Sequence, residues 1–266
     1  MNTSHPPSGA SEQPVVITRV SDTQWHAVQD DLVVGRGHTS RRSDGRNFVS
    51  IDAWHAAAFD RLAEAMSAAL PTPLYTLVDE ADLDLASDWK RVGFTIGRRE
   101  REYLVPTDPR ITGLDAVQSP PGVTILPVGG AEEAPLRAVD REIRDEVAAT
   151  VGWQSMPAEV LALPQGVTVA DPSKYAAAAA QCGQYVGLLR LVNMTRQPRI
   201  GLIAVVADQH RRGIARALLA QVLGSLHRSG IEAAAAEVDE SNDAALALFE
   251  GVGARRAGSN LELVRV

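Results

Sequence analysis

A basic, glycine-containing loop stands directly before a predicted helix start in residues 203–216, Ile-Ala-Val-Val-Ala-Asp-Gln-His-Arg-Arg-Gly-Ile-Ala-Arg. The start of a helix offers unpaired N–H groups and a partial positive charge, which favour binding of a pyrophosphate. Gly213 lets the backbone approach an anion closely, Ala215 keeps the surface low, and the neighbouring arginines add positive charge. The pattern therefore predicts an anion site, with a solvated basic face as the alternative.

The elements around this loop alternate between strand and helix. The apolar run 201–206 predicts a buried strand, and apolar residues repeat at helical spacing over 214–226. Residues 233–239 predict a second strand, and Asn242 begins a second helix. A closing strand at 261–264 gives the order strand, helix, strand, helix, strand, so we expect an α/β fold.

The loop resembles the acetyl-CoA pyrophosphate loop of the GNAT superfamily of N-acetyltransferases. That loop has Arg or Gln, two residues, Gly, one residue, and then Gly or Ala. Gly213 and Ala215 fit this pattern, whereas His210 takes the first position. The departure is mild, because the family's main contacts at this loop come from backbone amides.

A second motif of the same family follows the next strand. The family has an Asn there, a Tyr seven residues later and a Gly four residues after that, and this chain has Asn242, Phe249 and Gly253. The usual Tyr protonates the departing thiolate, which phenylalanine cannot do. The resemblance therefore implies an acetyl-CoA-dependent N-acetyltransferase in which solvent, or a substitute residue, supplies this proton.

Glu237 is the expected general base of this reaction. It lies twelve residues before Phe249, the spacing between the base glutamate and the acid tyrosine in ribosomal-protein acetyltransferases of this superfamily. Asp239 lies on the same strand face and is the second catalytic candidate. The alternative is a strand carboxylate satisfied by a neighbouring backbone amide or arginine.

The resemblance also assigns the cofactor contacts. In the family the strand that here ends near Val205 splays from the next one, and the thioester lies in the gap. A backbone N–H near Val205 is expected to polarise the thioester carbonyl, and Asn242 to bind the pantetheine arm. The expected acetyl-CoA-binding residues are Ala204, Val205, His210, Arg211, Arg212, Gly213, Ile214, Ala215, Arg216, Asn242 and Phe249.

The acceptor pocket of this fold comes from the helices after the first strand, here residues 132–163. Acidic groups beside an aromatic ring can hold a cation, although most of these charges are expected to form a solvated helix face. The candidates are Asp140, Glu142, Asp145, Glu146, Trp153 and Met156.

The chain repeats itself at a constant offset. Residues 78–82, Val-Asp-Glu-Ala-Asp, match residues 238–242, Val-Asp-Glu-Ser-Asn, and residues 92–93 match 252–253 as Val-Gly. Chance similarity of short acidic turns is the alternative. We expect two GNAT-like lobes, each a mixed α/β sheet flanked by helices, with the N-terminal lobe abbreviated.

The first lobe is expected not to bind acetyl-CoA. At the same offset Ala53 stands in the place of Gly213, and Asp52, which repels an anion, stands in the place of Arg212. Its expected role is to cover an edge of the C-terminal sheet and to wall one side of the acceptor cleft. The expected organisation is a disordered tail at 1–14, the degenerate lobe at 15–108, a linker at 109–122 and the catalytic domain at 123–266.

The composition of the chain limits the functional classes to which the protein could belong. A net charge of −7 disfavours nucleic acid and mildly favours a cationic acceptor, and no run approaches the roughly 18 to 20 apolar residues of a membrane span. The single Cys182 excludes an internal disulfide, and the histidines show no metal-ligand spacing. We expect a cytoplasmic enzyme without a metal, acting on a small-molecule primary amine such as an antibiotic-type or amino-sugar metabolite. A homodimer, a protein or peptide N-acetyltransferase, and a catalytically silent acetyl-CoA-binding regulator stay open.

Overall fold

A computed structural model describes residues 14–42, 45–150, 171–192 and 197–266. The chain forms two compact units, described separately below. Unit 1 consists of residues 1–78, 82–97 and 262–266, and unit 2 of residues 79–81 and 98–261. All but the last residue of the expected tail, 1–14, lies outside the described residues.

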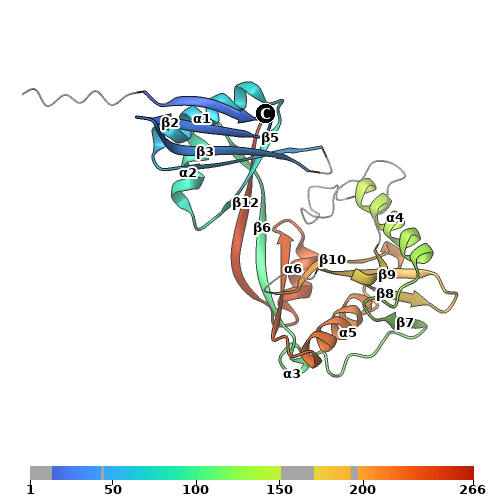
Figure 1. The fold of residues 1–266 in the computed structure, drawn as a ribbon. Coiled ribbons are helices and arrows are strands. Elements are labelled where there is room, and N and C mark those ends of the chain that lie inside the picture. The colour runs from blue at the N-terminus through green and yellow to red at the C-terminus, as the bar shows by residue number, and fades with distance from the viewer. Residues whose placement is uncertain (1–13, 43–44, 151–170, 193–196) are drawn as a thin grey trace, which may run out of the picture. The chain divides into compact units, whose positions relative to one another are not determined.

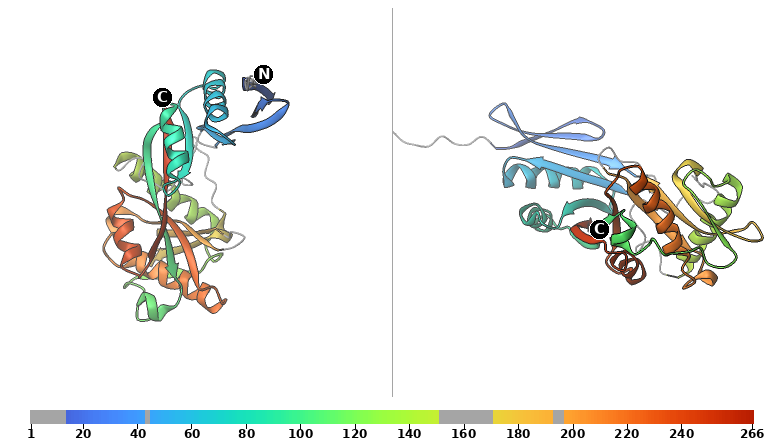
Figure 2. Two further views of the ribbon diagram at one scale, coloured as in Figure 1. Left: turned by 90° about the vertical axis from the view of Figure 1, so that its left-hand side faces the viewer. Right: turned by 90° about the horizontal axis from the view of Figure 1, so that it is seen from below.

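Unit 1 is built on antiparallel strands β1 to β4, with β5 added parallel to β4. Its elements are β1 (Val16–Ser21), β2 (Gln24–Gln29), β3 (Leu32–Arg41), β4 (Asn47–Ala53), α1 (Ala56–Ala69), β5 (Leu74–Asp79) and α2 (Leu83–Arg91). Helix α1 packs along β2, β3 and β4 (Figure 2) and buries Phe59, Leu62 and Met66 on the side that faces them. The apolar residues of α1 therefore repeat at helical spacing because they form the face that packs against the strands.

In unit 2 the strands run in the order β12-β6-β11-β10-β9-β8-β7, and Figure 1 shows α4 on one face of β8 and β9 and α5 on the other. The elements are β6 (Thr95–Pro106), α3 (Pro109–Thr112), β7 (Val123–Leu126), α4 (Glu133–Ala149), η2 (Pro172–Lys174), β8 (Tyr175–Ala180), β9 (Tyr185–Val192), β10 (Arg199–Val205), η3 (Ala207–Gln209), α5 (Ile214–Arg228), β11 (Ala233–Asp239), α6 (Asp243–Glu250) and β12 (Arg255–Arg265).

The predicted mixed α/β fold is confirmed. The strand at 233–239 and the start of the helix at 214 lie where their sequence patterns place them. The strand predicted at 201–206 begins two residues earlier, at Arg199, and the closing strand is longer than its apolar run suggests. Apolar side chains of α5, including Leu218, Leu219 and Leu223, are buried in the core of unit 2.

The sequence repeat has a structural counterpart at the turns before α2 and α6. Asp79 Oδ1 accepts a hydrogen bond from the Ala81 amide at 2.9 Å, and Asp239 Oδ1 accepts one from the Ser241 amide at 2.9 Å. Two further equivalent residues then cap the two helices. Asp82 accepts the amide of Leu85 and Asn242 accepts the amide of Ala245, both at 3.0 Å.

The two helices also end alike. Gly93 and Gly253 have φ values of 93° and 75°, a left-handed conformation that glycine adopts without strain. In each case the next amide bonds back to an aromatic residue of the helix, Phe94 to Trp89 O at 3.0 Å and Ala254 to Phe249 O at 3.1 Å. The matching hydrogen bonds support the sequence repeat.

The last strand of each repeat is divided between the two compact units. Strand β6 precedes the expected linker at 109–122, yet its residues 98–106 belong to unit 2 and pair antiparallel with β11. Strand β12 ends the chain, yet its residues 262–266 belong to unit 1. A strand from the N-terminal half therefore covers the edge of β11, as the sequence predicts, while the limits 15–108 and 123–266 stay a prediction.

Candidate active site

The anion loop between β10 and α5 has the backbone that its sequence predicts. Arg211 and Gly213 have φ values of 60° and 87°, and a Cβ added to Gly213 would meet nothing within 4 Å. Gly213 is therefore required by its backbone angle, and the space before it is open. Among the described residues no side chain caps α5, so the amides of its first turn, at Ile214 and Ala215, face that space without a side-chain acceptor.

The basic side chains of the loop differ in what they contact. His210 Nε2 lies 2.7 Å from Val205 O and ties the loop to the end of β10. Arg212 contacts the side chain of Gln209 and donates to Pro121 O at 3.2 Å. His210 and Arg212 thus shape the loop, and all three basic side chains, including Arg211, are exposed.

The two strands beside the loop separate. Strands β10 and β11 pair in parallel only at Arg199 with Ala235 and at Ile200 with Ala236. Strand β10 continues to pair with β9 as far as Val205, so it diverges from β11 while it stays in the sheet. This is the splay that the family resemblance implies at Ala204 and Val205.

A small cavity of about 50 Å³ lies in this splay. Its lining brings together residues of β10, β11 and α6 that are far apart in the sequence. They are Ile200, Gly201, Leu202, Ile203, Glu237, Val238, Asp239, Asn242, Ala245 and Phe249. Four residues that the sequence singles out, Glu237, Asp239, Asn242 and Phe249, therefore meet at one place.

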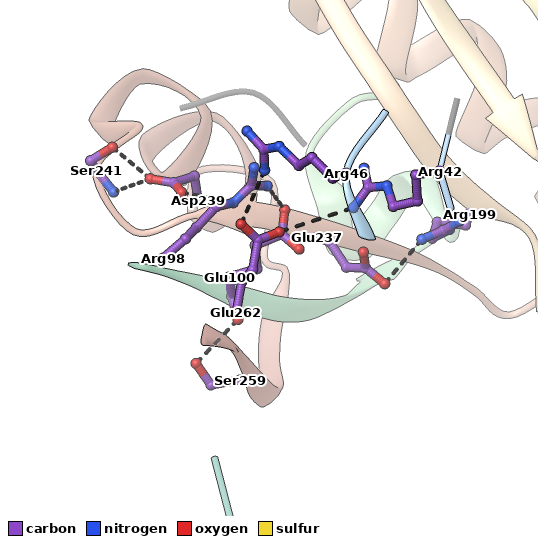
Figure 3. A network of polar contacts seen from close by, with 10 residues as sticks. All are labelled: Arg42, Arg46, Arg98, Glu100, Arg199, Glu237, Asp239, Ser241, Ser259 and Glu262. Carbon is purple, nitrogen blue, oxygen red and sulfur yellow. Dashed lines mark hydrogen bonds and ion pairs between the residues drawn. The ribbon is translucent and has the colours of Figure 1, made fainter. Parts of the chain in front are cut away.

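Glu237 has the environment of a proton acceptor. Its side chain is 27% exposed, and its Oε1 lies 3.0 Å from Arg199 Nη1 (Figure 3). Burial raises the pKa of Glu237 above its usual value; Arg199 opposes this effect, whereas the negative charges of Glu100 and Glu102 add to it. A carboxylate with a raised pKa is a better base near neutral pH.

Asp239 is differently placed, although it lies on the same strand. Its Oδ1 accepts hydrogen bonds from the amide of Ser241 at 2.9 Å and from its hydroxyl at 2.5 Å, and its Oδ2 lies 3.2 Å from Arg98 Nε (Figure 3). Arg98 also contacts Glu100. The carboxylate is buried and its oxygens are occupied, and Asp79 makes the same turn in the first repeat. In this geometry Asp239 stabilises the turn before α6.

Phe249 is buried at one side of the cavity. Its ring stacks on Tyr103 of β6, with centroids 6.4 Å apart and an angle of 19° between the planes. The Tyr103 hydroxyl donates to Glu250 at 2.9 Å. The pKa of Tyr103 is raised, mainly by burial and also by this hydrogen bond. Tyr103 is not among the described residues that line the cavity, and its hydroxyl is engaged with Glu250.

The acidic residues expected in the acceptor pocket fall into different environments on α4. Asp140 is buried and lies 2.7 Å from Arg144 Nε, while both oxygens of Glu146 accept the Ala207 amide at 3.0 and 3.1 Å. Glu142 and Asp145 are exposed, as expected of a solvated face. Two further predicted residues, Trp153 and Met156, lie outside the described residues.

Unit 1 retains the strand splay without the anion loop. Only two residues connect β4 to α1, whereas eight connect β10 to α5. His55 Nδ1 accepts the Ala58 amide at 3.2 Å and so caps α1 with its own side chain. At the offset of the repeat, Leu77 stands in the place of Glu237, so unit 1 has no carboxylate at this position.

These differences predict a single acetyl-CoA per chain, because α5 has no side-chain cap at its N-terminus, whereas His55 caps α1, the corresponding helix of unit 1. Isothermal titration calorimetry of the full chain with acetyl-CoA should give a stoichiometry near one. Two equivalent sites would contradict this prediction.

Part of the chain is similar to a known protein family. Residues 145–263 match the family model described as "Acetyltransferase (GNAT) domain". That segment contains the loop and the residues that line the cavity. No curated protein matches the chain.

Several solved structures share the fold of the whole chain. A GCN5-related N-acetyltransferase from Sphaerobacter thermophilus is 16% identical with a TM-score of 0.62, covering 93% of this chain and 82% of that one. A tandem GNAT protein from the clavulanic acid biosynthesis pathway is 12% identical with a TM-score of 0.63, covering 91% and 82%. A GNAT-family acetyltransferase from Colwellia psychrerythraea is 12% identical with a TM-score of 0.56, covering 91% and 85%. The predicted tandem GNAT fold is confirmed.

Two general features complete the description. Of the helices in the described residues, none is long and apolar enough to cross a membrane. Within the same part of the chain, no group of three or more His, Cys, Asp or Glu residues is arranged to hold a metal ion.

Sequence reasoning missed the residues that surround Glu237. Arg199 starts β10, and Arg98, Glu100 and Glu102 lie on β6. The charged sequence of β6, Arg-Arg-Glu-Arg-Glu at 98–102, was a usable signal of a polar strand. Nothing in the sequence of β6 itself indicates that this strand pairs with β11.

Proposed function

We propose that this chain is an acetyl-CoA-dependent N-acetyltransferase that acts on the primary amine of a small molecule. The observation that carries the proposal is the cavity in the splay of β10 and β11, where Glu237, Asn242 and Phe249 meet. The anion loop with its open helix start supports pyrophosphate binding beside this cavity. The match of residues 145–263 to the GNAT acetyltransferase family model supports acetyl transfer as the reaction.

The proposed reaction begins with Glu237. Its carboxylate accepts a proton from the ammonium group of the acceptor, directly or through water, and the freed amine attacks the thioester carbonyl carbon. A carbon–nitrogen bond forms while an N–H group near Val205 stabilises the negative oxygen. The carbon–sulfur bond then breaks, the nitrogen releases its second proton to solvent to give the amide, the thiolate leaves and takes a proton from solvent, and Glu237 returns its proton to solvent.

The remaining cavity residues would orient the acetyl donor. Asn242 uses its Oδ1 to cap α6, so its amide NH₂ group is the part able to donate to the pantetheine arm. Phe249 offers an apolar ring at the cavity wall. The negative charges of Glu100 and Glu102 near Glu237, together with a net charge of −7, support a cationic acceptor.

The experiment that tests this function measures free CoA released from acetyl-CoA by the full chain with two sets of acceptors. One set contains small primary amines, including amino sugars and amine-containing antibiotics, and the other contains peptides with free N-termini. We expect acceptor-dependent release with members of the first set. Release with peptides alone would identify a protein or peptide N-acetyltransferase.

Phe249 favours a second candidate function, a catalytically silent acetyl-CoA-binding regulator, because it lacks the usual proton donor. Acetyl-CoA binding without release of CoA by any acceptor of either set would support this candidate and contradict the proposed enzyme.

The variant Phe249→Tyr tests how the thiolate is protonated. If solvent supplies the proton, the added hydroxyl at the cavity wall should leave kcat unchanged or raise it modestly, by less than about tenfold. The dissociation constant for acetyl-CoA, measured by calorimetry, should stay the same. A clear fall in kcat at unchanged affinity would contradict solvent protonation, because added donor capacity cannot slow a step that solvent serves.

A further inference from the structure

Two pairs of carboxylates face each other across the neighbouring strands β6 and β11 of unit 2. In the antiparallel pair of β6 and β11, Glu102 is the partner of Glu237, and Glu100 is the partner of Asp239. Directly opposed residues have Cβ atoms about 4.5 to 5.5 Å apart, and like charges in such positions destabilise a sheet. The two pairs therefore need an explanation.

The second pair is neutralised within the fold. Arg98 contacts Glu100 and lies 3.2 Å from Asp239, so one guanidinium serves both carboxylates (Figure 3). Ser241 supplies further donors to Asp239. This pair stabilises the turn before α6.

The first pair is not neutralised in this way. Glu102 Oε1 accepts a hydrogen bond from the neutral amide of Asn260 at 2.5 Å, and within the described residues no cationic side chain forms an ion pair with it. Arg199 lies on the Glu237 side of the pair, 3.0 Å from the Glu237 carboxylate. On the Glu102 side of the pair, the described residues therefore supply a neutral hydrogen-bond partner and no cation.

Strand β12 is built to hold the Glu102 side chain. A Cβ added to Gly258 would lie 2.9 Å from Glu102 Oε2, so the absence of a side chain there leaves room for the carboxylate. Asn260, two residues later, supplies the hydrogen bond. The position of Glu102 is thus fixed by two residues of the neighbouring strand.

The carboxylate of unit 1 that corresponds to Glu102 has different neighbours. Glu262 corresponds to Glu102 at the offset of the repeat, and its Oε1 and Oε2 lie 3.2 Å from Arg46 Nη1 and 4.0 Å from Arg42 Nη1. Leu77 occupies the position that corresponds to Glu237. Arginines pair with the carboxylate in the repeat that has no base, and a neutral amide holds it in the repeat that has one.

We propose that Glu102 is a positioning residue for acetyl transfer, which acts by keeping its neighbour Glu237 a strong proton acceptor. The inference rests on the proposed function, because it takes Glu237 to be the general base. It gives the N-terminal half of the chain a part in the reaction, since β6 precedes the expected linker.

The charges around Glu237 support this role. The charged groups that act on Glu237 are Arg199 of β10 and Glu100 and Glu102 of β6. Burial raises the pKa of Glu237, Arg199 lowers it, and both carboxylates raise it further. Removing the charge of Glu102 should therefore make Glu237 a weaker base, while removing Arg199 should have the opposite effect.

The test compares Glu102→Gln and Arg199→Gln with the wild-type chain by carbon-13 NMR titration of the Glu237 carboxyl group. We expect Glu102→Gln to lower the pKa of Glu237 by about 0.5 to 1, and Arg199→Gln to raise it by a similar amount. Glu232→Gln is the matched control, because Glu232 is exposed and lies five residues before Glu237. The Glu232→Gln variant should leave the pKa of Glu237 unchanged.

Activity and stability are measured on the same proteins. In Glu102→Gln the acidic limb of the pH profile of kcat/KM should move to lower pH, and the maximal rate should fall about two- to tenfold. Its midpoint of denaturant unfolding at neutral pH should stay equal to or exceed that of the wild type, because a like-charge pair is removed. A residue with a merely structural role would lower that midpoint and leave the pKa of Glu237 unchanged.

The outcomes separate the inference from the proposed function. An unchanged pKa of Glu237 in Glu102→Gln would overturn the inference and leave the proposed function intact. A shifted pKa with an unmoved rate profile would overturn Glu237 as the base, and with it the effect of Glu102 on the reaction.

Discussion

Replacing Glu237 by glutamine is expected to lower kcat/KM for the amine by about 10²- to 10⁴-fold at neutral pH, the usual effect of losing a general base. Glutamine keeps the size of the side chain and can still contact Arg199, but it cannot accept the proton of the ammonium group. The affinity for acetyl-CoA, measured by calorimetry, should change little, because Glu237 is not needed to hold the donor.

The pH dependence of this loss identifies its cause. As pH rises, a growing fraction of the amine is deprotonated in solution, so the deficit of Glu237→Gln should shrink. In the wild type, the acidic limb should lie above the usual range of a glutamate, because burial raises the pKa of Glu237. A deficit that is constant with pH would point to lost binding instead.

Stability gives a second check on the same variant. A carboxyl group whose pKa is higher in the folded than in the unfolded state stabilises the fold below its unfolded pKa, and this contribution is lost as pH rises through the folded pKa. At neutral pH the ionised Glu237 therefore does not stabilise the fold, and Glu237→Gln should unfold at the same denaturant concentration as the wild type, or higher.

Asp239→Asn is the matched control on the same strand. It removes the charge that Arg98 contacts and weakens the turn made with Ser241. It should lower the free energy of unfolding by about 1 to 3 kcal/mol. Any loss of rate in this variant should therefore accompany lost stability, in contrast to Glu237→Gln.

Gly213→Asp is expected to weaken acetyl-CoA binding by about 10²-fold or more while the chain still folds. The new carboxylate would stand at the N-cap of α5, where it repels a pyrophosphate and accepts the amides that the pyrophosphate would use. The positive φ of 87° costs about 1 to 2 kcal/mol for a residue with a Cβ, and the cap offsets part of that cost.

Gly213→Asn separates charge from shape. Asparagine has the same size and the same capping ability but no charge, so it should bind acetyl-CoA more tightly than Gly213→Asp and less tightly than the wild type. Calorimetric titration with acetyl-CoA measures all three proteins. Wild-type affinity in Gly213→Asp would show that the cofactor loop lies elsewhere.

The parts of the fold that the sequence predicts are those decided by local chemistry. The periodicity of residues 214–226 and the apolar run at 233–239 identify α5 and β11 because each pattern matches the face that its element buries. Asn242 is predicted as a helix start because an amide side chain caps the free N–H groups there. The repeat is visible for the same reason, since its identical residues make identical turns.

The pairing between distant strands could not be predicted in this way. Glu102 and Glu237 lie in different halves of the chain, and nothing local to either residue specifies that they face each other. The contact of Arg199 with Glu237 depends in the same way on how β10 and β11 pair. Asp239 shows a related limit, because alternation places it on the strand face of Glu237 but does not reveal that Ser241 and Arg98 occupy its carboxylate.

The proposed site is tested most directly by quantifying the acetylated amine by mass spectrometry, together with free CoA, for wild type and Glu237→Gln at neutral pH. The acceptor is the best small amine found in the panel, and both proteins are saturated with acetyl-CoA. We expect one acetylated amine for each CoA released by the wild type, and a rate about 10²- to 10⁴-fold lower for Glu237→Gln. Equal rates for the two proteins would contradict the proposed site, and acetyl-CoA binding without any acetylated product would contradict the proposed activity.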